Sequence, residues 1–189
     1  SSVCLSAEKW DFESDLGGWR GWGMDREITR PRPIVELTAD NPKSGKQCLV
    51  IRDDVTEGAP YANYPYGEIK PGVQYVLKGW VRSDVERDQA NTYIGAIQMK
   101  EIDGKPVFAG VNFIPINKIT KEWTQFSGIL EFGGDIKAVE LMIRPTIWNQ
   151  NNDKAQLWVD DIEFRPLKAV SFEKLDIKRY DILESTGTV

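Results

Sequence analysis

The feature that most constrains this fold is a two-residue alternation of apolar and polar side chains that recurs along much of the 189-residue chain. Such alternation is typical of β-strands with one buried face, whereas helices repeat apolar residues every three to four positions. Runs that read as strands cover residues 47–52, 73–82, 91–100, 107–114, 122–131, 138–147 and 156–164. No segment of a dozen residues carries a helical apolar stripe, so the sequence predicts an all-β chain.

Turn-forming residues separate these runs. Asp103-Gly104-Lys105-Pro106 lies between two of them and predicts a β-hairpin. Further turn signals occur at 41–45, 70–72 and 148–153. Eight or so short strands without helices predict an all-β, two-sheet antiparallel β-sandwich or a barrel, in one domain over residues 1–167. The pattern loosens after Pro166, and residues 168–189 are predicted to form a linker or an additional edge strand, or to lead to a further module.

Charge excludes several function classes. The chain has 24 Lys and Arg, 29 Asp and Glu and no His, which gives a net charge of −5. Phosphate backbones need a clustered Lys/Arg face, which the sequence lacks, so we expect no nucleic acid partner. Without His, neither a Ser–His–Asp triad nor a His-ligated zinc site can form. No stretch reaches the ~18 apolar residues of a membrane span, so we expect no membrane partner.

Cysteine usage leaves two alternatives open. Cys4 and Cys48 could pair as a disulfide if the chain is exported, or both could be buried thiols.

Six short motifs follow one another in one order across residues 9–165. They are Phe12-Glu13 with Gly18-Trp19, Ser44-Gly45-Lys46, Ile69–Tyr75, Gly79–Arg82, Glu122-Trp123-Thr124 and Val159–Ile162. In this order and spacing the chain resembles the jelly-roll carbohydrate-binding modules of families four, nine, sixteen and twenty-two. The resemblance implies a jelly-roll sandwich of galactose-binding-domain-like type. It also implies a non-catalytic module that binds a polysaccharide or oligosaccharide and targets an attached, secreted, bacterial polysaccharide-degrading enzyme to it. We expect the module to be a monomer.

The same resemblance implies one structural calcium ion that ties the first and last strands together. Glu13 and Asp160 match the side-chain ligands of these modules, with Asp161 as the alternative to Asp160, because strand alternation directs only one of the two toward an ion. Main-chain carbonyls at Asp11, Lys43 and Lys46 match the remaining ligands. Calcium takes six to eight oxygen ligands of these kinds. Without the resemblance, Glu13 and Asp160 read as ordinary solvated carboxylates.

Sugar rings stack on flat aromatic side chains, and their hydroxyls bond to amide, guanidinium and carboxylate groups. Tyr61, Tyr64 and Tyr66 surround a proline just before a strand, and tyrosine suits a half-wet site. Along 139–148, alternation directs Val139, Leu141, Ile143 and Ile147 inward and Glu140, Met142, Arg144, Thr146 and Trp148 outward. On the predicted hairpin, Phe108 and Asn112 share a face at a spacing of four. We expect these tyrosines and Phe108, Asn112, Glu140, Arg144 and Trp148 to bind the glycan.

Three alternatives remain at the level of the sequence. Trp19, Trp22 and the stretch 30–33 could form a site at the tip of a long early loop instead of a cleft. A glycosidase would need two carboxylates across a cleft, for which Glu140 with Glu68 or Glu101 are candidates, and a lyase could use Tyr64 with Arg144. A cell-surface interaction or adhesion sandwich would instead predict an exposed apolar patch.

Overall fold

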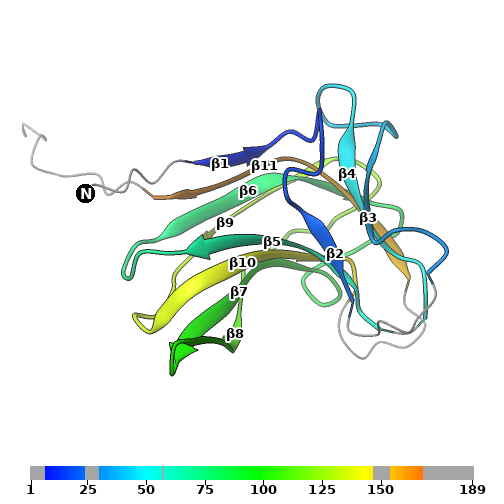
Figure 1. Cartoon of the computed structure of the whole chain (residues 1–189). Helices are drawn as coiled ribbons and strands as arrows, with labels where there is room; N and C mark the ends of the chain where they lie inside the picture. Colours follow the sequence, from blue (N-terminus) through cyan, green and yellow to red (C-terminus); the bar gives the residue numbers. More distant parts are fainter. Residues whose placement is uncertain (1–6, 24–29, 57, 147–153, 168–189) are drawn as a thin grey trace, which may run out of the picture.

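The computed structural model describes residues 7–23, 30–56, 58–146 and 154–167. These residues form two antiparallel β-sheets that lie one over the other, as Figure 1 shows. The six-stranded sheet has the order β3-β4-β11-β6-β9, with β1 also paired to β11; its strands are β1 (Glu8–Trp10), β3 (Val35–Thr38), β4 (Cys48–Asp53), β6 (Tyr75–Ser83), β9 (Thr124–Leu130) and β11 (Ala155–Pro166). The five-stranded sheet has the order β2-β5-β10-β7-β8, with β2 (Arg20–Trp22), β5 (Tyr61–Glu68), β7 (Tyr93–Ile102), β8 (Lys105–Phe113) and β10 (Ile136–Arg144). The predicted two-sheet sandwich is confirmed.

The core lies between the two sheets and follows the alternation in the sequence. On β10, Val139, Leu141 and Ile143 are buried, as predicted, because every second side chain of the strand points into the sandwich. Tyr75, Leu77 and Val81 of β6 enter the same core from the other sheet. The side chains between these positions therefore point away from the core, and on the five-stranded sheet they form an outer face.

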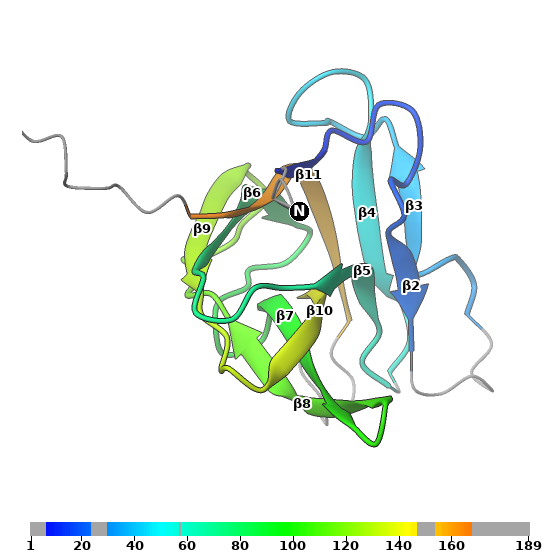
Figure 2. The same ribbon diagram turned by 60° about the vertical axis from the view of Figure 1, so that its left-hand side comes forward.

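The first and last strands of the described chain lie side by side. β1 pairs with residues 162–164 of β11, while residues 155–159 of β11 pair with β4 along the same edge. The opposite edge of β11 pairs with β6. In Figures 1 and 2, β1 follows the orange end of β11. The prediction that the two ends of the domain meet is therefore confirmed.

The structure corrects the prediction that the tyrosine-rich segment precedes a strand. Residues 61–68 are themselves β5, which pairs with β10 throughout and with β2 only at 61–63. Pro65 lies beyond the part that β2 covers and beside an irregularity in the β10 register, so its missing N–H interrupts no regular ladder there. The short strands β1, β2 and β3 were also missing from the predicted strand set, because three or four residues are too few for a readable alternation.

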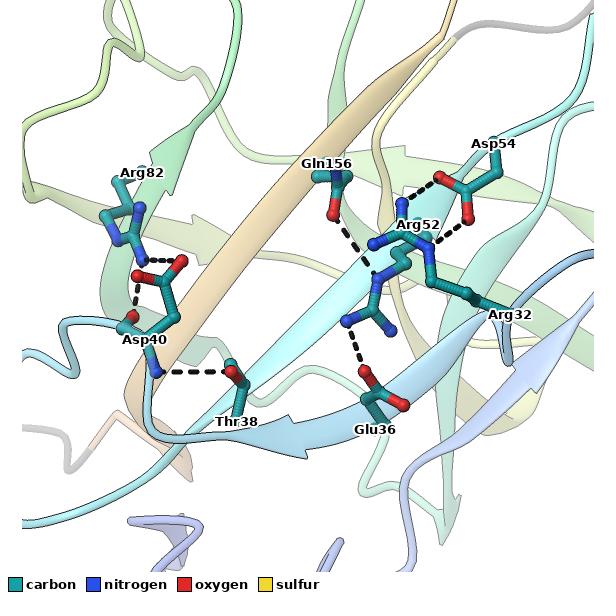
Figure 3. A network of polar contacts seen from close by, with 8 residues as sticks. All are labelled: Arg32, Glu36, Thr38, Asp40, Arg52, Asp54, Arg82 and Gln156. Atoms are coloured by element: carbon teal, nitrogen blue, oxygen red, sulfur yellow. Dashed lines mark hydrogen bonds and ion pairs between the residues drawn. The ribbon is translucent and has the colours of Figure 1, made fainter.

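A network of charged side chains covers the outer face of the six-stranded sheet (Figure 3). Arg82 donates to the carbonyl and carboxylate of Asp40, and Arg52 pairs with Glu36 and donates to Gln156. Nearby, Cys48, Val50 and Trp158 form a small second apolar cluster. Cys48 is a buried free thiol, and Cys4, its potential disulfide partner, lies outside the described residues. Burial raises the pKa of the Cys48 thiol to about 12.

Candidate functional site

A groove of about 620 Å³ lies on the outer face of the five-stranded sheet. Its aromatic, charged and apolar lining comes from all five strands: Trp22, Tyr61, Tyr93, Ile97, Met99, Phe108, Val111, Phe113, Glu140, Met142 and Arg144. Ligand sites in proteins are typically concave, with an apolar lining and a few placed polar groups, and have volumes of about 300–1,000 Å³. The groove fits this description and is the candidate functional site.

The central strand β10 supplies the polar groups. Glu140, Met142 and Arg144 alternate with buried core residues and line the groove, as the sequence predicts. The carboxylate of Glu140 accepts a hydrogen bond of 2.7 Å from Nδ2 of Asn63 on β5. Asn63 is only 1% exposed, and its Oδ1 has no hydrogen-bond partner among the described residues. The buried amide therefore fixes the position of a carboxylate that faces the groove.

Arg144 and two aromatic rings form the β2–β5 end of the groove. The Arg144 guanidinium lies 5.0 Å from the centroid of the Tyr61 ring. The centroid of the Trp22 ring lies 4.9 Å from that of the Tyr61 ring. Tyr61 is thereby reduced to 7% exposure, whereas Trp22 keeps 37%. Burial lowers the pKa of Arg144 and raises that of Tyr61, and each favours the charged form of the other. Tyr61 thus packs under Trp22 and Arg144, and Trp22 is the aromatic ring at this end that a ligand can reach.

Strands β7 and β8 supply the other side of the groove. Tyr93 and Phe113 stack with centroids 4.4 Å apart and planes at 14°. Phe108 is 62% exposed. The hairpin that carries these rings is the one predicted from Asp103-Gly104, and both residues have positive φ, as a tight turn requires. It lies at the lower end of the molecule in Figure 2.

The prediction that Phe108 and Asn112 share a face is wrong. The register between β7 and β8 shifts between Gln98 and Met99, where Gly110 has a φ of 124°. A β-bulge adds one residue to a strand and reverses the facing of all residues beyond it. Phe108 therefore points into the groove with Val111 and Phe113. Asn112 does not line the groove and donates to the carbonyl of Glu131 at 2.7 Å.

The prediction of one platform of three tyrosines is also wrong, because β5 is a strand. Tyr61 lines the groove, whereas alternation directs Tyr64 and Tyr66 against the sandwich core. The Tyr64 ring lies 4.6 Å from Trp10 and 5.9 Å from Trp19, and the Tyr66 ring lies 4.7 Å from Phe164. Two of the three tyrosines are thus packing residues.

The sequence predicts that Thr146 and Trp148, which follow β10, point outward on the same face as Glu140. The structure contradicts this prediction for Thr146 and does not describe Trp148. Thr146 is buried, and its hydroxyl donates to Asp53 at 2.5 Å, because β10 ends at Arg144 and alternation no longer applies. Trp148 lies outside the described residues. From the sequence we missed Tyr93 and Phe113 as lining residues and Asn63 as the partner of Glu140, and we considered Trp22 only for the alternative loop-tip site. Alternation along β5 puts Asn63 on the same face as Tyr61, so the sequence pattern could have identified Asn63. The face on which Trp22 lies is set by the pairing of β2 with β5, which a local pattern does not show.

The other sequence-level candidates are not brought together. Trp19 is buried at 2% exposure in the core, and Arg32 forms a two-bond pair with Asp54, so these residues do not share a loop-tip site. Of the proposed catalytic pairs, Tyr64 packs inward while Arg144 lines the groove. Glu68 and Glu101 are exposed residues that do not line the groove.

A second arrangement, the clasp, joins Glu13 and Asp160 to the loop 43–47. The carboxylate of Glu13 accepts hydrogen bonds from the N–H groups of Lys46 and Gln47, and it lies against Gly45, where a Cβ would meet it within 2.6 Å. The carboxylate of Asp160, which has no exposed surface, accepts from the N–H groups of Lys43 and Ser44. Burial raises the pKa of Asp160 to about 6, although these N–H groups lower it.

The strand alternation expected to separate Asp160 from Asp161 does not hold at this point of β11. Asp161 has a φ of 48°, and the register of β11 shifts between Asp160 and Glu163. This irregularity breaks the alternation, so Asp161 also contacts the loop, through the hydroxyl of Ser44 at 3.1 Å. Asp11 accepts from the N–H of Glu13 at 3.2 Å.

The clasp fits a hard cation in its donor chemistry. Its carboxylates are oxygen ligands, and the buried Asp160 charge has only N–H partners among its hydrogen bonds. Within the described part of the chain, no group of three or more Asp, Glu or Cys side chains gathers as a metal site. A cation here would thus depend on main-chain carbonyls as well as on Glu13 and Asp160.

Comparison with known protein families gives a match over most of the chain. The model of the family described as "Carbohydrate binding domain" matches residues 6–153. The chain belongs to this family. It is therefore a carbohydrate-binding module, and the expectation of a binding module agrees with the family. Comparison with curated protein sequences gives no match.

Solved structures of carbohydrate-binding modules share the fold. The module is similar to the CBM22-1 xylan-binding domain of Paenibacillus barcinonensis Xyn10C, with a TM-score of 0.61 at 14% identity over 89% of this chain and 99% of that one. It is similar to the CBM22-1–GH10 modules of the Clostridium thermocellum xylanase 10B, solved with xylohexaose, with a TM-score of 0.56 at 14% identity over 85% of this chain and 28% of that one. A family 4 module gives a TM-score of 0.53 at 13% identity over 82% and 99%. The described residues contain no helix long and apolar enough to cross a membrane.

Proposed function

We propose that the groove on the five-stranded sheet is where this module binds its carbohydrate, with one glycan chain lying across β10. The observation that carries the proposal is the combination of an accessible indole, Trp22 on β2, with the Glu140 carboxylate and the Arg144 guanidinium on β10, one strand beyond β5 in the same sheet. Trp22 would stack on a sugar ring. Glu140, fixed by Asn63, would accept hydrogen bonds from hydroxyls, and Arg144 would donate to them.

Xylan is the first polymer to test, because two similar structures are described as xylan-binding domains. Binding would involve no bond cleavage. In native gels that contain soluble xylan, we expect retarded migration of the protein, and we expect no new reducing ends on prolonged incubation. Product formation would contradict a binding role, and unretarded migration with xylan and other soluble polysaccharides would contradict the proposed site.

We also propose that the clasp binds one calcium ion through Glu13 and Asp160, with main-chain carbonyls of Asp11, Lys43 and Lys46 as further ligands. The buried, negatively charged Asp160 and the proximity of Glu13 to Gly45 support this. The ion would stabilise the contact between the loop and the end of β11. It would take no part in the groove, whose lining contains none of these residues.

Membership of this family further supports an extracellular, bacterial setting and attachment to a polysaccharide-degrading enzyme. In that setting the module would hold an attached catalytic domain near its polymer. Co-purification of the native chain with hydrolytic activity on the bound polymer tests this attachment.

A further inference from the structure

The two sides of the groove differ in chemistry. On the β2–β5–β10 side, Tyr61, Glu140 and Arg144 offer hydroxyl, carboxylate and guanidinium groups. On the β7–β8 side, the lining between Tyr93 and the hairpin turn consists of Ile97, Met99, Phe108, Val111 and Phe113. These five side chains contain no nitrogen or oxygen atom, and the Met99 sulfur is only a weak acceptor, so this apolar side offers sugar hydroxyls no strong side-chain partner.

This difference has a physical consequence for a bound glycan. A hydroxyl that is buried without a hydrogen-bond partner weakens binding, because it gives up its bonds to water and gains none in return. A chain that extends from Glu140 onto β8 can stack a ring face on Phe108, but each hydroxyl that turns onto the apolar lining would lose water and gain no strong hydrogen-bond partner there. The apolar side thus disfavours free hydroxyls and favours a part of the ligand in which hydroxyls are masked.

The β-bulge in the β7–β8 hairpin contributes to the apolar side. Its register shift turns Phe108 into the groove together with Val111, and it removes Asn112, the one amide of this strand segment, from the lining. Phe108 and Val111 remain 62% and 41% exposed. An apolar surface of this extent beside polar sugar-reading groups is suited to a ligand that is polar at one end and apolar at the other.

We propose that the apolar side binds O-acyl substituents, in particular acetyl esters, of the glycan that the polar side holds. The inference rests on the proposed function, because the acylated sugar must continue a chain already bound by Glu140 and Arg144. An acetyl ester replaces a hydroxyl donor by a carbonyl and a methyl group, which can pack on Phe108 and Met99. A volume of about 620 Å³ for the whole groove suits a chain of this kind.

The hairpin also disfavours pairing of a second copy of this protein with the β8 edge of the groove. β8 is an edge strand, and its first residues are Lys105 and Pro106. Lysine and proline on an edge strand oppose pairing with another strand, and the bulge further along β8 has the same effect.

The test compares acetylated xylan and acetylated glucomannan with the same two polymers after mild alkaline de-esterification, by isothermal titration calorimetry. We expect about tenfold tighter binding to the acetylated form of at least one polymer, as burial of one methyl and ester group predicts. In Phe108→Ala the two forms should bind within about twofold of each other, and Val111→Asn should weaken the preference independently. Ile129→Ala, which removes a 52%-exposed side chain from β9 of the other sheet, should keep the full preference.

Equal affinity of the wild type for both forms of a polymer would overturn this inference and leave the proposed function intact. Absence of binding to all four polymers would overturn both. Light scattering is expected to show a monomer; a dimer that Phe108→Ala abolishes would mean that a second copy, and not an acyl group, occupies the apolar side.

Discussion

The Glu140 carboxylate accepts a 2.7 Å hydrogen bond from the Asn63 side-chain amide, across the boundary between β10 and β5. Glu140 lines the groove, whereas Asn63 is buried. A buried donor that holds an accessible carboxylate reduces the conformational freedom that the carboxylate would lose on binding a ligand. The pair is thus pre-organised for hydrogen bonding to a hydroxyl group.

Replacement of Glu140 tests this pre-organisation. Glu140→Ala should weaken glycan binding about tenfold or more, because hydrogen bonds to charged groups contribute about 1.5–3 kcal/mol. Glu140→Gln should lose less, since its amide oxygen can still accept from Asn63. Calorimetry of both variants measures the effect, with a thermal melt as the control for folding. Unchanged affinity in Glu140→Ala would exclude the residue from the site.

Tyr64 should act on stability and not on binding. Its ring contacts Trp10 and Trp19, and its removal would open a cavity at the edge of the core. Tyr64→Ala should reduce the free energy of unfolding by about 3 kcal/mol, as measured by urea denaturation, and Tyr64→Phe by much less. If the Tyr64→Ala variant kept wild-type stability but failed to bind glycan, Tyr64 would be a binding residue and not a packing residue.

The sequence predicts the longer strands and the inward residues of β10, because apolar–polar alternation over seven or more residues indicates a strand with one buried face. It fails where alternation is interrupted. The bulge opposite Met99 moves Asn112 away from the groove, and the irregularity after Asp160 directs both Asp160 and Asp161 to one loop. Pro65 interrupts the strand pattern of β5, so the sequence pattern places this segment before a strand. Trp22 enters the site only through pairing between distant segments, which a local pattern does not contain.

The clasp predicts a calcium-dependent stability. Saturating calcium should raise the melting temperature by about 5–10 °C relative to excess chelator, because an ion at about 100 times its dissociation constant adds about 2.7 kcal/mol. Glu13→Gln should abolish most of this shift while its amide oxygen still accepts from Lys46. The exposed Glu101→Gln serves as the matched control. Equal melting temperatures with calcium and with chelator would contradict the proposed calcium site.

Cys48 should be chemically inert in the folded protein. The thiol is fully buried, and burial raises its pKa to about 12, so almost no thiolate forms at pH 8. Mass spectrometry after iodoacetamide treatment should show Cys48 unmodified in the native state and alkylated in concentrated urea. Rapid native alkylation would contradict the burial. Protection in urea that is lost only after reduction would show that Cys48 pairs with Cys4.

The central claim, that a glycan chain lies in the groove beside Trp22, is tested most directly by calorimetric titration of the polysaccharide that the wild type retains. We expect Trp22→Ala to weaken binding at least tenfold, because stacking on the accessible indole is lost, and Ile129→Ala on the other sheet to bind like the wild type. Wild-type affinity in a folded Trp22→Ala variant would contradict the claim and place the binding surface elsewhere on the module.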